Sequence, residues 1–366
     1  MMQIPKTMRA VQGKDYGDID LMLSVAEHVA VPSLEDLPPK QRKNYLIIKT
    51  HAVALAPGDC RVLSGKTRPI QGPPSFPYIP GGDVCGVVVE APEGSTFAKG
   101  DRVAARFIGD GPIGALGDYA MISCEVCDKV PQNVSSLDAA VLASATPAIC
   151  LADRIQEGER VLILGAGGGV GSHLVQFIKG KAAFIAGVSR NPQRLLEEPM
   201  LYDEAVDYNQ EDPFSKQSWK DSPFDVVVDL AGGGWPRLIQ DRKQRVPSIV
   251  KPASQGGRYL TTTPDEAIFE IHSMLAANSI FMLPWLRRAI STRTLARRRL
   301  PKYTFAMILP KERQVITRTL EAAAKGTIQA VYEGPFDFTT EEVRSAFRLQ
   351  ETRHVKGKVV IGVSDE

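Results

Sequence analysis

A run of apolar residues ends in glycines near the middle of the chain, and this stretch is the clearest indication of chemistry. Residues 161–164 are apolar, and a helix-like segment covers 172–179. Gly168 and Gly171 keep the spacing of the last two glycines of G-x-G-x-x-G, with Ala166 in place of the first. Such a turn lets the backbone approach a pyrophosphate at the positive N-terminus of a helix. We therefore predict a dinucleotide-binding turn made by Gly168, Gly169, Val170 and Gly171; a glycine-rich turn in an ordinary loop is the alternative.

The next apolar run, residues 182–188, predicts a second strand within the ~30 residues that a strand–helix–strand unit needs. An acidic residue at its end would bind both ribose hydroxyls and mark NAD. This chain has Ser189 and Arg190 there, with Arg194 one turn further on. A guanidinium and a hydroxyl suit a 2′-phosphate, so we predict NADPH as the cofactor. An arginine exposed to solvent at the start of a helix is the alternative interpretation.

Length and composition are those of a soluble protein with two domains. The chain has 366 residues, of which 43% are hydrophobic and 23% charged. The net charge of +2 argues against a nucleic-acid partner, because binding to phosphate backbones needs a concentrated basic face.

Five cysteines are an odd number, so a disulfide framework is not expected and a reducing compartment fits best. Cys124 and Cys127 are expected on one strand, where positions three apart face opposite sides, so the pair is interpreted as structural rather than zinc-binding. The N-terminus has no signal-peptide pattern and no stretch is long enough to span a membrane. A cytoplasmic protein is expected, or an organellar one if a targeting segment was removed before Met1.

The elements that must position these residues fall into two classes. Short β signals, interrupted at the proline-rich loop 65–80, predict a small barrel-like β domain in the first part. A helical pattern covers 137–155. Beyond it, strands alternate with helical connections, which predicts an α/β fold with a doubly wound parallel sheet. The expected strands are 161–164, 182–188, 204–208, 225–230, 257–261 and 303–309, and β character returns over 327–363 around a helix at 340–349.

Eight landmarks in a fixed order resemble the medium-chain dehydrogenase/reductase superfamily, and within it the zinc-free quinone oxidoreductase branch that includes zeta-crystallin-like and reticulon-interacting members. The resemblance covers about Met8 to Val363. It implies a GroES-like substrate domain from residues 1–147 and 312–366, a Rossmann dinucleotide-binding domain from 148–311, and an active site between them. The landmarks are 57–59, 80–86, 100–103, 117–120, 158–163, 168–171, 225–229 and 357–360.

The resemblance also implies that zinc is absent. Alcohol dehydrogenases of this superfamily hold a catalytic zinc with cysteine, histidine and cysteine, and the matching positions here are Ala56, Gly82 and Leu142. None of these side chains can bind zinc, so no metal site is predicted.

Four further site residues follow from the resemblance or from location. Asp59 ends Ala-Pro-Gly-Asp, where the family has Asn-Pro-x-Asp beside the substrate pocket; capping of its own turn is the alternative. Thr146 aligns with a threonine near the nicotinamide ribose, and a helix cap is compatible with that role. Tyr208 matches a tyrosine near the adenosine. Tyr78 is a candidate proton donor by location alone, with solvent as the alternative.

Six arginines follow an apolar segment at 280–286, and they are Arg287, Arg288, Arg293, Arg297, Arg298 and Arg299. One interpretation is a peripheral contact with anionic lipid. The favoured one is a solvated helix face or part of a subunit interface, since Pro284 interrupts the apolar run.

The sequence thus predicts an NADPH-dependent, zinc-independent oxidoreductase that transfers hydride to a quinone or to the activated C=C bond of an enone. The alternatives are an enoyl-thioester or polyketide enoyl reductase and a non-catalytic NADPH-binding regulator. The resemblance further implies a homodimer formed through the strand at 303–309.

Overall fold

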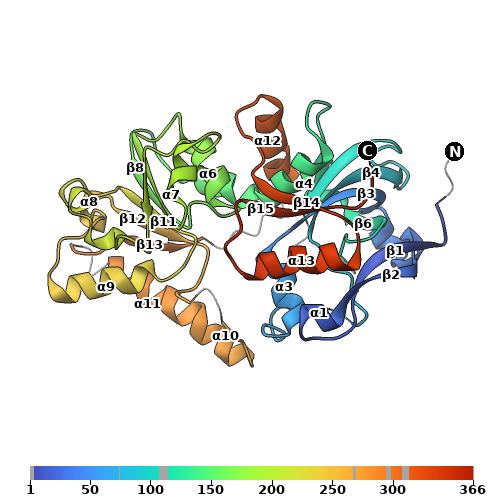
Figure 1. Ribbon diagram of the computed structural model, residues 1–366, viewed down its shortest axis with the longest axis horizontal. Coiled ribbons are helices and arrows are strands. Elements are labelled where there is room, and N and C mark those ends of the chain that lie inside the picture. Colours follow the sequence, from blue (N-terminus) through green and yellow to red (C-terminus); the bar gives the residue numbers. More distant parts are fainter. Residues whose placement is uncertain are drawn as a thin grey trace. The chain divides into compact units, whose positions relative to one another are not determined.

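The computed structural model describes residues 4–73, 75–106, 114–266, 269–293, 298–306 and 313–365. The chain divides into two units, Met1–Pro147 with Leu309–Glu366 and Ala148–Ile308. Both chain ends therefore belong to the first unit, and the second unit is inserted between them in the sequence (Figure 1).

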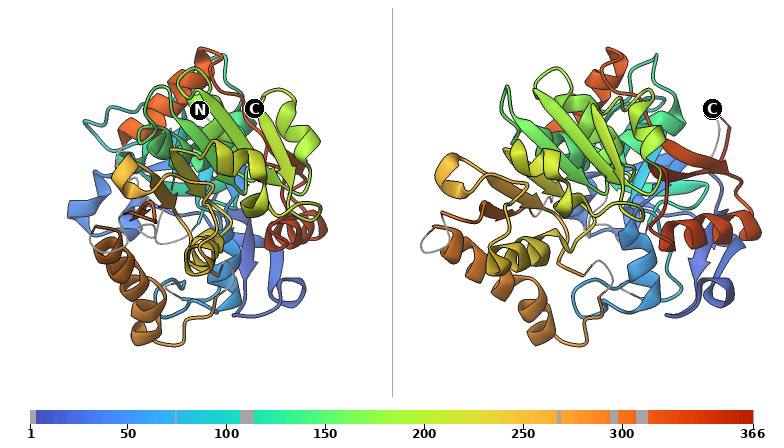
Figure 2. Two further views of the ribbon diagram at one scale, coloured as in Figure 1. Left: turned by 90° about the vertical axis from the view of Figure 1, so that its left-hand side faces the viewer. Right: turned by 60° about the vertical axis from the view of Figure 1, so that its left-hand side comes forward.

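The second unit, Ala148–Ile308, is built on a six-stranded parallel sheet in the order β10-β9-β8-β11-β12-β13 (Figure 2). The strand order reverses between β8 and β11, as in a doubly wound dinucleotide-binding sheet, so the predicted fold class is confirmed. The last predicted strand is shorter than expected, and its residues 307–309 lie outside the described residues. The strands are β8 (Arg160–Leu164), β9 (Phe184–Ser189), β10 (Glu204–Asp207), β11 (Val226–Asp229), β12 (Arg258–Thr261) and β13 (Lys302–Phe305).

The strands of this sheet are apolar on consecutive positions because both faces are covered. On β8, Val161 and Ile163 belong to the hydrophobic cluster on one face, which includes Leu174 of the helix after the glycine turn. Leu162 belongs to the cluster on the opposite face, which includes Trp235. Since successive side chains of a strand point to opposite faces, burial on both sides requires an unbroken apolar run.

Helices connect these strands. No helix in the described part of the chain combines the length and apolar character that a membrane span requires. The helices of the unit are α6 (Gly171–Ile178), α7 (Pro192–Leu196), α8 (Gln217–Asp221), α9 (Gly234–Gln244), α10 (Met274–Ile280), α11 (Met282–Arg293), and the 3-10 helices η3 (Pro213–Ser215) and η4 (Ala253–Gln255).

The first unit, Met1–Pro147 with Leu309–Glu366, is mainly β. Its larger sheet has the order β14-β15-β3-β4-β5-β7, with β6 paired to β3, and β1 pairs with β2. The C-terminal strands β14 and β15 thus complete a sheet begun by the N-terminal part of the chain. The strands are β1 (Thr7–Gly13), β2 (Leu23–Ala30), β3 (Tyr45–Leu55), β4 (Asp83–Glu90), β5 (Arg102–Arg106), β6 (Tyr119–Ser123), β7 (Cys127–Lys129), β14 (Tyr332–Phe336) and β15 (Lys358–Gly362).

The helical segment predicted at 137–155 consists of two helices, α4 (Ser136–Ser144) and α5 (Thr146–Ala152). Ser135 caps α4 by accepting a hydrogen bond from the Asp138 N–H at 3.1 Å. The other helices of the unit are α1 (Ile19–Met22), α2 (Pro39–Arg42), α3 (Pro57–Ser64), α12 (Arg313–Ala324), α13 (Thr340–Glu351), and the 3-10 helices η1 (Leu34–Asp36) and η2 (Cys124–Val126).

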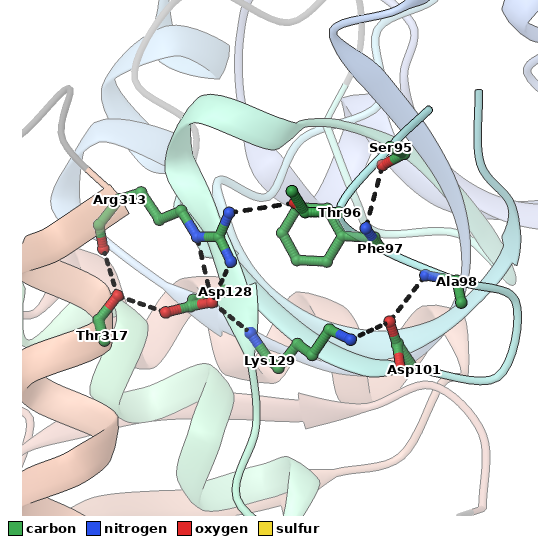
Figure 3. A network of polar contacts seen from close by, with 9 residues as sticks. All are labelled: Ser95, Thr96, Phe97, Ala98, Asp101, Asp128, Lys129, Arg313 and Thr317. Carbon is green, nitrogen blue, oxygen red and sulfur yellow. Dashed lines mark hydrogen bonds and ion pairs between the residues drawn. The ribbon is translucent and has the colours of Figure 1, made fainter. Parts of the chain in front are cut away.

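A polar network fixes α12 to β7, where the chain has returned to the first unit (Figure 3). The Asp128 carboxylate accepts hydrogen bonds from Arg313 Nη2 at 2.8 Å and Nε at 3.1 Å, and from the Thr317 hydroxyl. The Arg313 guanidinium also lies over the Phe97 ring, 4.7 Å from its centroid. Because Asp128 is buried, removal of Arg313 would leave a carboxylate without its charged partner.

The Cys124 and Cys127 pair does not lie on one strand, so that expectation was wrong. β6 ends at Ser123, Cys124 begins η2, and Cys127 begins β7. The Ser123 side chain accepts a hydrogen bond from Glu125 N–H, which turns the backbone out of the strand. The two thiols are therefore on separate elements, and the five cysteines form no disulfide.

Candidate functional site

The glycine-rich turn joins β8 to α6 with the backbone geometry that a phosphate-binding turn requires. Gly165 has φ of +80°, which a residue with a side chain rarely adopts. A Cβ at Gly171 would lie 2.6 Å from the Ala166 carbonyl oxygen, so only glycine allows this close approach of helix and turn. Val170 provides no side-chain cap for α6. Within the first turn of α6, the Ser172 N–H donates to the Gly168 carbonyl oxygen at 3.0 Å, so the backbone of the turn itself closes the start of the helix.

His173, in the first turn of α6, contacts the glycine-rich turn. Its Nδ1 lies 2.7 Å from the Gly169 carbonyl oxygen, and the side chain is fully buried. The histidine is therefore part of the packing around the turn.

The end of β9 brings Ser189 to the edge of the glycine turn, and Arg190 and Arg194 follow it in the chain. A Cβ at Gly167 would lie 3.1 Å from Ser189 Oγ, so the serine hydroxyl lies against the turn. Arg190 is exposed and Arg194 half-buried. Neither guanidinium has a hydrogen-bond acceptor or carboxylate partner within the described ranges.

Tyr208 lies next to this group at the end of β10. Asp207 pairs with Ser189 in the parallel register, and Tyr208 follows it with 45% of its surface exposed. The Asp207 carboxylate accepts hydrogen bonds from the Asn209 N–H at 2.9 Å and Nδ2 at 3.1 Å. It therefore caps its own turn.

Asp229 is the last residue of β11, the strand next to β8, and its carboxylate orders the loop that follows β11. Its carboxylate accepts hydrogen bonds from the N–H groups of Ala231 (3.0 Å), Gly232 (2.7 Å) and Gly234 (3.0 Å), and from the Tyr259 hydroxyl. Burial raises the pKa of Asp229. A Cβ at Gly165 would lie 3.3 Å from Ala231 N, so this loop packs against the glycine turn.

Asp229→Asn is expected to lower the free energy of unfolding by about 2 kcal/mol, because the new amide NH₂ would face a backbone N–H donor in a buried site. Tyr259→Phe is the control, since it removes one donor and leaves the loop bonded, at a cost of about 1 kcal/mol. Urea unfolding of the wild type and of the two variants measures both changes in the free energy of unfolding. Equal stability of Asp229→Asn and the wild type would refute this role.

In the first unit, Asp59 and Tyr78 lie near each other. The Asp59 carboxylate accepts hydrogen bonds from Ala56 N–H at 2.8 Å and Gly81 N–H at 3.1 Å. It thus caps its own turn and also joins α3 to the loop before β4. Burial and the nearby Asp83 carboxylate raise the pKa of Asp59 to about 6. Burial and the Asp59 charge raise the pKa of Tyr78 to about 12.

Thr146 is the first residue of α5, and its hydroxyl accepts a hydrogen bond from Arg106 Nη1. The same guanidinium forms an ion pair with Asp83, at 3.5 Å from Nε to Oδ1. Sequence reasoning missed Arg106, because no motif marks it. Its ion pair depends on the antiparallel register that sets the end of β5 opposite Asp83, and the sequence carries no signal for that register.

Lys358, at the start of β15, completes a buried charged cluster with Asp59, Asp83 and Arg106. It is 7% exposed, and burial lowers its pKa to about 8 while the Asp83 charge opposes that shift. Groups of three or more histidine, cysteine, aspartate or glutamate side chains that could hold a metal ion are not found in the described part of the chain.

The raised pKa of Asp59 gives a pH-dependent prediction. The folded state binds the Asp59 proton more tightly than the unfolded state, whose pKa is near 3.8. Its contribution to stability is therefore complete below about pH 4 and lost as the pH rises through about 6. The stability of the wild type relative to Asp59→Asn is expected to fall by about 3 kcal/mol between these limits. Urea unfolding at both pH values tests this, and a constant difference would contradict it.

Comparisons with known proteins agree with this architecture. Residues 42–141 match the family model described as an alcohol dehydrogenase GroES-like domain, and residues 202–361 match the one described as a zinc-binding dehydrogenase. The predicted GroES-like domain is thereby confirmed.

Curated relatives match most of the chain. A chloroplast envelope quinone oxidoreductase homolog of Arabidopsis thaliana is 30% identical over 271 residues, covering 71% of this chain and 76% of the relative. An NADPH-dependent alkenal/one oxidoreductase of the same plant is 26% identical, covering 98% of this chain and 80% of the relative.

A solved structure also agrees with this architecture. The quinone oxidoreductase from Coxiella burnetii superposes with a TM-score of 0.72 at 21% identity, covering 98% of this chain and all of that one, which shows the shared fold. The two matched domain models and the identity to the curated relatives establish that the chain belongs to the medium-chain dehydrogenase/reductase superfamily, in its quinone oxidoreductase branch.

Proposed function

We propose that this protein is an NADPH-dependent, zinc-independent reductase of quinones or of the activated C=C bond of enones. The observation that carries the proposal is the combination of a glycine turn, whose helix has no side-chain cap, with Ser189 and the unpaired Arg190 at the neighbouring strand end. Relatives named as quinone and alkenal/one oxidoreductases support the same reaction class.

The residues of the second unit fit a dinucleotide phosphate. A Cβ at Gly168 would meet only the Gly165 carbonyl oxygen, at 3.5 Å, so the outer side of the turn has room for a phosphate. The backbone from Gly168 to Gly171 would bind the pyrophosphate. Ser189, Arg190 and Arg194 would bind the 2′-phosphate, and Tyr208 would pack near the adenosine.

When bound, NADPH supplies a hydride, and the acceptor takes that hydride together with one proton. Thr146 would orient the nicotinamide ribose, and its hydroxyl accepts a hydrogen bond from Arg106. Asp59 fixes the turn at Ala56 and the loop at Gly81. Tyr78, with a pKa of about 12, stays protonated at neutral pH and is the proposed proton donor. Zinc independence rests on the side chains of Ala56, Gly82 and Leu142, none of which can be a ligand.

The test of reaction class is product analysis. Purified protein is incubated with NADPH and, separately, phenanthrenequinone, an aliphatic enone and an enoyl thioester. The proposal expects one hydroquinone or saturated ketone formed per NADPH oxidised. Turnover of the enoyl thioester alone would replace this assignment with an enoyl-thioester reductase, and tight NADPH binding without any turnover would replace it with a regulator.

Two further properties, the oligomeric state and the cellular compartment, belong to the same proposal. β13 is an edge strand of the parallel sheet, which supports a homodimer formed by pairing of this edge with a second copy. Sedimentation as a monomer would refute the dimer. The five cysteines as thiols support a reducing compartment, such as the cytoplasm.

A further inference from the structure

Helices α10 and α11, drawn in orange in Figure 1, carry most of the exposed large apolar side chains of the described residues. Within the described residues, seven of the eleven exposed large apolar side chains lie on these two helices. Leu275 is 83% exposed and Leu286 48%. The seven are Met274, Leu275, Met282, Leu283, Trp285, Leu286 and Ile290.

On α11 these side chains form one stripe. Met282, Leu286 and Ile290 are spaced by four residues, and Leu283 lies beside them on the same face. Arg287 borders the stripe, and Trp285 lies across the helix on its other border. An apolar stripe bordered by arginine and tryptophan is the pattern of a helix that lies in a membrane interface.

The segment that contains this stripe is rich in positive charge. From Ile271 to Lys311 the sequence contains eight lysines and arginines and no aspartate or glutamate. Arg298 and Arg299 are exposed, as are Arg242 and Lys243 on α9. Arg288 forms an ion pair with Asp265, at 2.8 Å from Nη1 to Oδ1, so its charge is neutralised within the protein.

A groove of about 600 Å³ lies between α9 and α11 at the border of the stripe. Lys243 and Arg287 line it together with Ser291, and Trp235 forms part of its wall. No carboxylate in the described ranges pairs with Lys243 or Arg287. The groove therefore presents two cations beside an apolar surface, which matches a phosphate headgroup attached to acyl chains.

We propose that α10, α11 and the groove between α9 and α11 form a docking surface for an anionic phospholipid bilayer. The apolar side chains enter the boundary between headgroups and acyl chains, while Arg287 and Lys243 contact lipid phosphates. The exposed apolar side chains differ from a solvated polar helix face, which was one of the two interpretations that the sequence favoured. The other, a subunit interface, is separated from the lipid surface by the test below. The surface lies wholly within the second unit, so the proposal does not depend on the reaction catalysed.

Trp285 provides a direct probe. It is 38% exposed, whereas the other two tryptophans, Trp219 and Trp235, are 1% and 3% exposed. The test mixes the full chain with phosphatidylcholine vesicles with or without phosphatidylglycerol, and measures flotation and quenching of tryptophan by brominated lipid. Binding and quenching are expected only with phosphatidylglycerol, and both should decrease at high salt.

Two variants and their matched controls show which surface of the protein binds the vesicles. Arg287→Glu is expected to weaken binding about thirtyfold, since one attractive charge becomes repulsive. Leu286→Gln should weaken it about tenfold through lost apolar burial. Lys14→Glu and Leu21→Gln make the same changes at exposed positions of the first unit and should bind as the wild type.

The proposal is overturned if phosphatidylglycerol vesicles do not bind the protein, or if they bind both variants as tightly as the wild type. Binding without quenching of Trp285 would also overturn it, because another surface would be in contact. A dimer that dissociates in Leu286→Gln, measured by sedimentation equilibrium, would instead identify a second copy of the chain as the occupant. Unchanged thermal unfolding midpoints confirm that the variants are folded.

Discussion

Arg190→Ala is expected to raise the Kd for NADPH about ten- to a hundredfold and to leave the Kd for NADH unchanged. Arg190 follows β9 directly and is exposed, and the side chain of the preceding Ser189 lies against the glycine turn. A charge-assisted hydrogen bond to a 2′-phosphate contributes about 1.5–3 kcal/mol, and NADH has no such phosphate. Fluorescence titration with both nucleotides measures the two constants.

The matched control is Arg242→Ala, which removes an exposed arginine of the same unit from α9. It should bind both nucleotides as the wild type does. An equal loss of NADPH and NADH affinity in Arg190→Ala would show that the arginine supports the turn rather than the 2′-phosphate, and would remove the basis for NADPH specificity.

Gly171→Val is expected to weaken NADPH binding more than a hundredfold and to cost about 1–3 kcal/mol of stability. A Cβ at this position would lie 2.6 Å from the Ala166 carbonyl oxygen and 2.7 Å from that of Gly165. Both neighbours are backbone atoms of the turn, so the turn itself must move. Nucleotide titration and thermal unfolding measure the two effects separately.

Gly180→Val is the control for this substitution. Gly180 follows α6, and a Cβ there would meet nothing within 4 Å. It should keep wild-type NADPH affinity. Wild-type affinity in Gly171→Val would mean that the turn does not contact the pyrophosphate.

The sequence predicted the second unit well because its signals are local. Burial on both faces makes β8 and β11 continuous apolar runs, and the backbone geometry at Gly165 and Gly171 excludes other residues. Family membership and fold class followed from these and from the short landmarks.

The charged cluster of the first unit could not be predicted in the same way. Arg106, Asp83 and Lys358 come from three strands, and their proximity depends on the sheet order that joins the C-terminal β15 to β3 and β4. The separation of Cys124 from Cys127 depends on a hydrogen bond from Glu125 N–H to Ser123, which strand periodicity does not reveal. The exposure of the α11 stripe likewise depends on which face of the helix packs on the sheet.

The most direct test of the central claim is the initial rate of quinone-dependent NADPH oxidation, measured beside NADH with phenanthrenequinone as acceptor. The proposed function predicts turnover with a kcat/KM for NADPH at least about tenfold above that for NADH, since one contact to the 2′-phosphate suffices for this ratio. Equal or greater kcat/KM with NADH, or no turnover of any acceptor by protein that binds NADPH, would contradict it.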